Sequence, residues 1–145
     1  MNHPGDRDEA PRILVGGFVS DRGRLGALGD VRRSRWSGLV PCAARWGADL
    51  VAVGRPPSGV DAVAVIARLK GDPATAATPV LHAAPADDTC PECPADVCLS
   101  SGSTPGQLAR VAEALLELAR ARARRSGLYA ARASLATGAA SRPAP

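Results

Sequence analysis

The sequence has few aromatic residues and only two histidines, which limits both its core and its chemistry. Aromatic residues make up 3% of the 145 residues. The core must therefore be built mainly from Ala, Val and Leu, and no aromatic platform for stacking nucleic-acid bases is available. His3 lies in a charged N-terminal stretch and His82 lies inside an apolar run. Little is left for acid–base or nucleophilic catalysis, so we expect no enzymatic activity.

Long apolar runs are also missing. No run reaches the ~18 residues of a transmembrane helix, and the charged N-terminus lacks the apolar stretch of a signal peptide. We therefore expect a cytoplasmic protein without membrane contact. The formal net charge is +4, and arginines crowd one stretch near the C-terminus. No groove-reading motif accompanies them, which favours a solvated helix end over a nucleic-acid surface. The arginines of this C-terminal stretch are Arg120, Arg122, Arg124, Arg125 and Arg132.

Three continuous apolar runs end in turn signals. Residues 12–15 stop at Gly16-Gly17, residues 49–53 stop at Gly54, and residues 79–84 stop at Pro85. A weaker run covers residues 95–99. Continuous rather than alternating apolar character indicates strands that are buried on both faces, as in a parallel sheet.

Helical spacing fills the gaps between these runs. Residues 61–70 carry apolar side chains at helical spacing and end at Gly71. Thr104-Pro105-Gly106-Gln107 is typical of a helix start, and the helix that follows is predicted to run to about Arg125. A third helix over residues 22–33 is weakened by its glycines. Alternating strands and helices predict a doubly wound α/β domain over residues 12–125. We expect a disordered tail over residues 1–11 and a flexible tail over residues 126–145.

Two segments carry a family resemblance. Residues 49–80 (DLVAVGRPPSGVDAVAVIARLKGDPATAATPV) and 95–118 (ADVCLSSGSTPGQLARVAEALLEL) resemble the receiver domains of bacterial response regulators. The resemblance covers roughly residues 12–125. It implies a flavodoxin-like three-layer fold with four or five parallel strands. Residues 34–42 and 85–94 are short for this family, so we expect the second strand and the fourth helix to be reduced or missing. Arg35 to Pro41 is the only candidate for that second strand.

The resemblance also locates a phosphorylation site that this chain lacks. Receivers accept a phosphoryl group on an aspartate, with two acids for Mg²⁺ and a hydroxyl and a lysine for the phosphoryl oxygens. The nucleophile position falls on Gly54, and the two acid positions fall on Gly16 and Gly17. The hydroxyl position falls on Ala84 and the lysine position on Ser101. The sequence therefore predicts a degenerate receiver without its phosphoacceptor.

The cysteines offer a second, weaker kind of site. Cys90 and Cys93 form a C-x-x-C pair, Cys98 follows, and Cys42 is distant. Zinc prefers four such ligands, and a second C-x-x-C or a histidine pair is absent. Cys90, Cys93 and Cys98 are thus weak candidates for a metal or redox site. Inert thiols remain the expected state, and we expect no cofactor or resident metal.

Three functions are compatible with these residues. The first is a phosphorylation-independent signalling or regulatory module of a two-component-type system. It would act through contacts with a protein partner or in a homodimer. The second is a small-ligand domain that binds an anion in the emptied receiver pocket, lined by Arg55 and Ser101. The third is a metal-responsive or redox-responsive protein built on the cysteines.

Overall fold

The fold is known from a computed structural model, which describes residues 10–17, 22–83, 93–99 and 104–140. Its centre is one five-stranded sheet with the order β2-β1-β3-β4-β5, in which every pair of neighbours is parallel. This is the doubly wound order of flavodoxin-like folds, so the expected fold class is confirmed. The strands are β1 (Arg12–Gly16), β2 (Asp30–Ser34), β3 (Leu50–Val53), β4 (Val80–Ala83) and β5 (Val97–Leu99).

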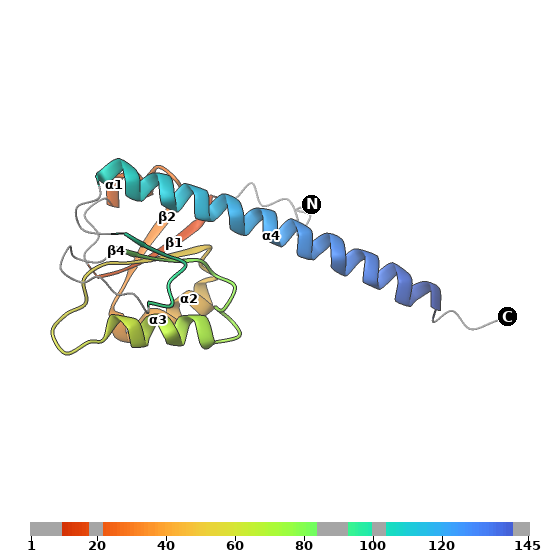
Figure 1. Ribbon diagram of the computed structural model, residues 1–145, viewed down its shortest axis with the longest axis horizontal. Coiled ribbons are helices and arrows are strands. Elements are labelled where there is room, and N and C mark those ends of the chain that lie inside the picture. The colour runs from red at the N-terminus through yellow and green to blue at the C-terminus, as the bar shows by residue number, and fades with distance from the viewer. Residues whose placement is uncertain (1–9, 18–21, 84–92, 100–103, 141–145) are drawn as a thin grey trace.

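Helices cover both faces of the sheet. α1 (Arg22–Gly26) and α4 (Pro105–Ala140) lie on one face, and α2 (Leu39–Trp46) and α3 (Ala62–Gly71) lie on the other (Figure 1). A short 3-10 helix, η1 (Trp36–Gly38), precedes α2. Each face has its own core cluster: Leu81 and Leu116 belong to the α4 side, and Val51 and Ile66 belong to the α3 side. The domain therefore has three layers, as the resemblance implies.

The local sequence signals explain several of these elements. β3 is buried at all four positions, and β1 at all but its first. The Asp61 side chain accepts hydrogen bonds from Val63 N and Ala64 N and so caps α3. At the start of α4, Thr104 N donates to Gln107 Oε1 at 2.7 Å, which is half of the predicted capping box. These predictions from sequence are confirmed.

The prediction for residues 22–42 was wrong. The second strand is present as β2 and pairs with all five residues of β1, whereas the predicted helix over residues 22–33 ends at Gly26. β2 is an edge strand with mostly exposed polar side chains, which hides it from a search for apolar runs. The proposed strand Arg35 to Pro41 instead forms η1 and the start of α2. Pro41 is tolerated there because the first turn of a helix needs no N–H donor.

The last helix extends further than predicted. α4 continues to Ala140 instead of ending near Arg125, and its C-terminal part projects beyond the sheet (Figure 1). Residues 126–140 contain six alanines and two leucines, which are strong helix formers. The extent of the domain and the N-terminal tail remain predictions. Between β4 and β5, the described residues 93–96 are not helical, while residues 84–92 lie outside the described part. None of the described helices is both long and apolar enough to cross a membrane.

Candidate functional site

Three of the five predicted pocket positions meet at the carboxyl ends of the central strands. Gly16 is the last residue of β1, Gly17 follows it, and Gly54 directly follows β3. Gly54 N donates to Gly16 O at 2.9 Å, so the two strand ends are in direct contact. This is the edge at which doubly wound sheets bind ligands. The predicted positions of these three glycines at the strand ends are observed, and their assignment to a degenerate phosphoacceptor pocket stays a prediction. Ala84 and Ser101 lie outside the described residues.

Neither acid position has room for a side chain. A Cβ on Gly16 would overlap Leu39 Cδ1, which belongs to a fully buried side chain of α2. A Cβ on Gly17 would lie 2.8 Å from both Arg55 O and Trp36 Nε1. Gly17 also has a φ of 75°, a backbone conformation that strongly favours glycine. Apolar side chains from η1 and α2 therefore occupy the space that two carboxylates and an Mg²⁺ ion would need.

Trp36 is the main residue at this end of the sheet that the sequence reasoning did not assign to the site. Its side chain is 7% exposed, and its Nε1 has no hydrogen-bond partner within the described part of the chain. Trp36 begins η1, the element misread from sequence as a strand. Its role could not be inferred, because only the fold brings η1 against Gly17.

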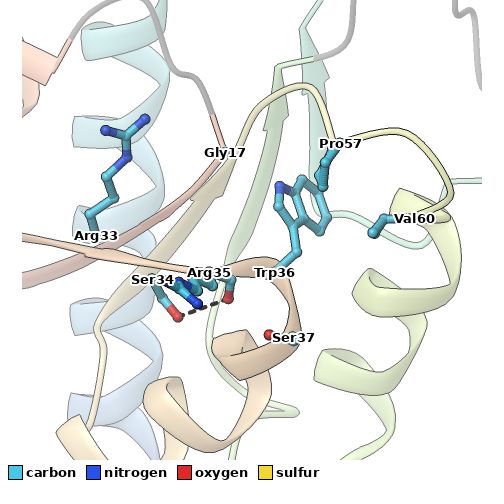
Figure 2. Close-up of a pocket in the computed structure, with 8 residues that line it drawn as sticks. All are labelled: Gly17, Arg33, Ser34, Arg35, Trp36, Ser37, Pro57 and Val60. Atoms are coloured by element: carbon cyan, nitrogen blue, oxygen red, sulfur yellow. Dashed lines mark hydrogen bonds between the residues drawn. The ribbon is translucent and has the colours of Figure 1, made fainter.

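A surface pocket of about 540 Å³ opens beside Gly17 rather than above Gly54. Trp36 and Pro57 lie side by side at its centre with Val60 close by, while the Arg33 side chain extends away from Trp36 (Figure 2). Arg35, Ser34 and Ser37 complete the lining. Arg55, which was expected to hold an anion, is not among these residues. Among the described residues, no observation therefore favours the anion-binding alternative, which stays a prediction.

Two nearby carboxylates along the chain, Asp49 and Asp61, have structural tasks elsewhere, and Asp21 lies outside the described residues. Asp49 Oδ2 accepts a hydrogen bond from Arg12 N at 2.7 Å, at the amino end of β1. Asp61 caps α3, as described above. Neither one replaces the missing acids at Gly16 and Gly17. Neither Asp49 nor Asp61 is therefore placed to act as a nucleophile or as a metal ligand beside the described glycines.

Two of the cysteines lie close together, and a histidine that was not expected there lies beside them. Cys93 and Cys98 lie near His82, and one donor atom from each of the three is within 4.8 Å of the others. Cys42 is a separate free cysteine in α2, and Cys90 lies outside the described residues. His82 was predicted only as a residue inside the fourth strand, which is confirmed. Its pairing with β5 could not be read from the sequence, because strand register comes from tertiary structure.

Comparisons with known proteins bear on the fold. No model of a known protein family matches the sequence, and no curated protein matches it. Solved structures do match. A putative response regulator from Chloroflexus aurantiacus superposes with a TM-score of 0.63 at 20% identity, covering 74% of this chain and 98% of that one. A signal receiver domain of a histidine kinase from Syntrophus aciditrophicus gives 0.60 at 22% identity, with 74% and 91% covered.

A third structure covers more of this chain than these two. The signal receiver domain of an HD domain-containing protein from Pseudomonas fluorescens Pf-5 gives a TM-score of 0.67 at 16% identity, covering 81% of this chain and 94% of that one. All three structures match the fold of this chain, whose strand order and layers were described above. The chain therefore has the fold of the receiver domains of response regulators.

Proposed function

We propose that this chain is a phosphorylation-independent, receiver-like signalling module of a two-component-type system that acts through protein contacts without enzymatic activity. The observation that carries the proposal is the packing at the carboxyl end of β1. Gly16, Gly17 and Gly54 provide neither a nucleophile nor Mg²⁺ ligands, and Leu39 and Trp36 fill the space around the first two. Phosphoryl transfer depends on a placed nucleophile and on cations at the developing charge, which these residues cannot supply.

The close packing around Gly16 and Gly17 adds to the loss of reactive groups. A receiver that had lost only its aspartate would keep a cavity between the strand ends. Here the glycine at position 17 is required by its backbone conformation and by its contact with Trp36. The scaffold is therefore adapted to the absence of the acids, which supports a function that does not pass through a phosphorylated state.

The exposed surface of α4 is the contact surface that we favour. Leu118 is 47% exposed, which is unusual for a large apolar side chain, and Arg120, Arg122 and Arg124 are exposed just after it. An apolar residue beside several cations suits a protein partner with an acidic rim. A second copy of the chain is the other occupant of this surface. Light scattering of the wild type and of Leu118→Glu distinguishes the two: only a homodimer would dissociate.

Incubation with a small-molecule phosphodonor and Mg²⁺ tests the central claim. Intact-mass measurement should show no phosphoryl adduct on this chain, while a receiver domain that retains its aspartate becomes labelled under the same conditions. A beryllium fluoride titration should also leave the melting temperature unchanged, because the phosphoryl mimic has no carboxylate to bind. A stable adduct of one phosphoryl group on any aspartate would overturn the proposal.

A further inference from the structure

His82 and Cys98 are direct neighbours across two strands. β4 pairs with β5 in parallel, and the register places His82 opposite Cys98. Paired residues of neighbouring strands point to the same face of a sheet. Val97 and Leu99 pack against the α4-side core, so Cys98 between them points to the α3 side. His82 lies on that same side and is only 4% exposed.

Cys93 completes the group from a different segment. It precedes β5 and packs against the core cluster on the α3 side, together with Ala95. Its Sγ lies 3.5 Å from His82 Nδ1. One donor atom from each of His82, Cys93 and Cys98 lies within 4.8 Å of the other two. An imidazole and two thiols from three separate positions thus converge on one point at the edge of the sheet.

We propose that His82, Cys93 and Cys98 bind a zinc ion. One imidazole and two thiolates form a donor set that zinc accepts in proteins, with the fourth position of the tetrahedron left to water or another ligand. The proposal adds His82, which the sequence reasoning did not include in a site, to two of the three cysteines that it named. It does not depend on the proposed signalling function.

The distances suit a tetrahedral ion. Metal–ligand bonds of ~2.3 Å to sulfur and ~2.0 Å to nitrogen place two donors of a tetrahedron about 3.5 to 3.8 Å apart. The His82 Nδ1 to Cys93 Sγ distance of 3.5 Å already lies in this range. The remaining donors, within 4.8 Å, need a shift of about 1 Å.

The electrostatics also favour a divalent ion. Two thiolates neutralise the charge of Zn²⁺, so a site beside the buried His82 would not leave a net charge inside the protein. Binding would join β4, β5 and the segment that contains Cys93. β5 has only three residues and one neighbouring strand, so a metal bond there would hold a weakly paired edge in place. Zinc binding should therefore stabilise the folded state.

Titration of the reduced full-length chain with Co²⁺, a spectroscopic substitute for zinc, tests the proposal. Two thiolate ligands should give a sulfur-to-cobalt charge-transfer band, and intense visible bands should report tetrahedral coordination. Zn²⁺ should displace Co²⁺ at one ion per chain and should raise the melting temperature. Cys98→Ser should weaken Co²⁺ binding at least about 100-fold, the upper end of the cost of losing an outer-shell partner. His82→Gln and Cys93→Ser should do the same.

Cys42→Ser is the matched control, because Cys42 is a free, half-buried cysteine on the same side of the sheet. It should bind Co²⁺ as the wild type does. Cys98 is exposed, so Cys98→Ser should keep its fold; far-UV circular dichroism and melting without metal check this directly. The comparison of these two variants separates a specific site from general binding to thiols.

Three results would overturn the proposal. The first is a fully reduced wild-type chain that gives no tetrahedral cobalt spectrum. The second is full affinity in Cys98→Ser, which would place the metal on the C-x-x-C pair instead. The third is an equal loss of affinity in Cys42→Ser and Cys98→Ser, which would indicate non-specific binding.

Discussion

The centre of the sheet and its β5 edge differ in what lies against the strands. At the centre, β1 ends in Gly16 and β3 is followed by Gly54, and apolar side chains from η1 and α2 pack against Gly16 and Gly17. At the edge, polar and chemically reactive side chains meet: His82, Cys93 and Cys98, with the Lys70–Asp96 ion pair nearby. Receiver chemistry belongs to the centre, where the described Gly16, Gly17 and Gly54 supply no reactive side chain. The groups suited to bind an ion lie at the edge instead.

The two regions also differ in the contacts that hold them together. Packing holds the centre, because Leu39 is fully buried against Gly16 and Trp36 lies on Gly17. Directed polar contacts hold the edge: Asp96 Oδ2 accepts hydrogen bonds from both Val80 N and Lys70 Nζ. A substitution that adds volume should therefore be most harmful at the centre, and one that removes a polar acceptor should be felt at the edge.

The largest effect is expected for Gly17→Ala. The new methyl group would meet Arg55 O and Trp36 Nε1 at 2.8 Å, and the residue would be held at a φ of 75°. Overpacking and left-handed strain together should lower the free energy of unfolding by about 3 kcal/mol. Gly59→Ala is the matched control: its φ is 86°, with no atom within 4 Å of the new Cβ. It should lose only about 1 kcal/mol. Urea denaturation measures both, and equal losses would show that the centre is not tightly packed.

A smaller effect is expected for Asp96→Ala at the edge. The change removes an acceptor 2.7 Å from Val80 N and an ion partner 3.0 Å from Lys70 Nζ. Loss of a hydrogen bond to a charged group should lower the free energy of unfolding by about 1.5 kcal/mol. Lys70→Met removes the ion pair but leaves the bond to Val80, so it should lose less than Asp96→Ala. Chemical denaturation measures the free energy of unfolding of both variants. A larger loss in Lys70→Met than in Asp96→Ala would show that the ion pair stabilises the edge.

The smallest effect is expected for Gly71→Ala, and its sign is opposite. Gly71 ends α3 with a negative φ and open space around its Cβ position. Alanine restricts the unfolded chain more than glycine does, so the free energy of unfolding should rise by about 0.5 kcal/mol. Thermal unfolding should show a slightly higher melting temperature. A loss of stability would mean that α3 needs a glycine at its end for a reason that packing does not reveal.

Parts of the molecule could be predicted from the sequence because their signals are local. The buried strands were marked by continuous apolar runs, α3 by Asp61 and Gly71, and the start of α4 by Thr104 and Gln107. β2 was missed because an edge strand needs only one partner and can carry polar side chains outward. The end of α4 was missed because the alanines and leucines of residues 126–140 favour a helix that continues past Ser126 and Gly127.

The sequence by itself determined that Gly16, Gly17 and Gly54 carry no carboxylate, and the resemblance predicts that they stand where a receiver has acids. Only the tertiary structure decided what fills that place. Trp36 reaches Gly17 from an element that the sequence did not predict, and Leu39 reaches Gly16 from the following helix. The pairing of His82 with Cys98 was decided in the same way, by the register of two strands. Residues that are far apart in the sequence come into contact only when the sheet forms, so local sequence preferences do not predict these contacts.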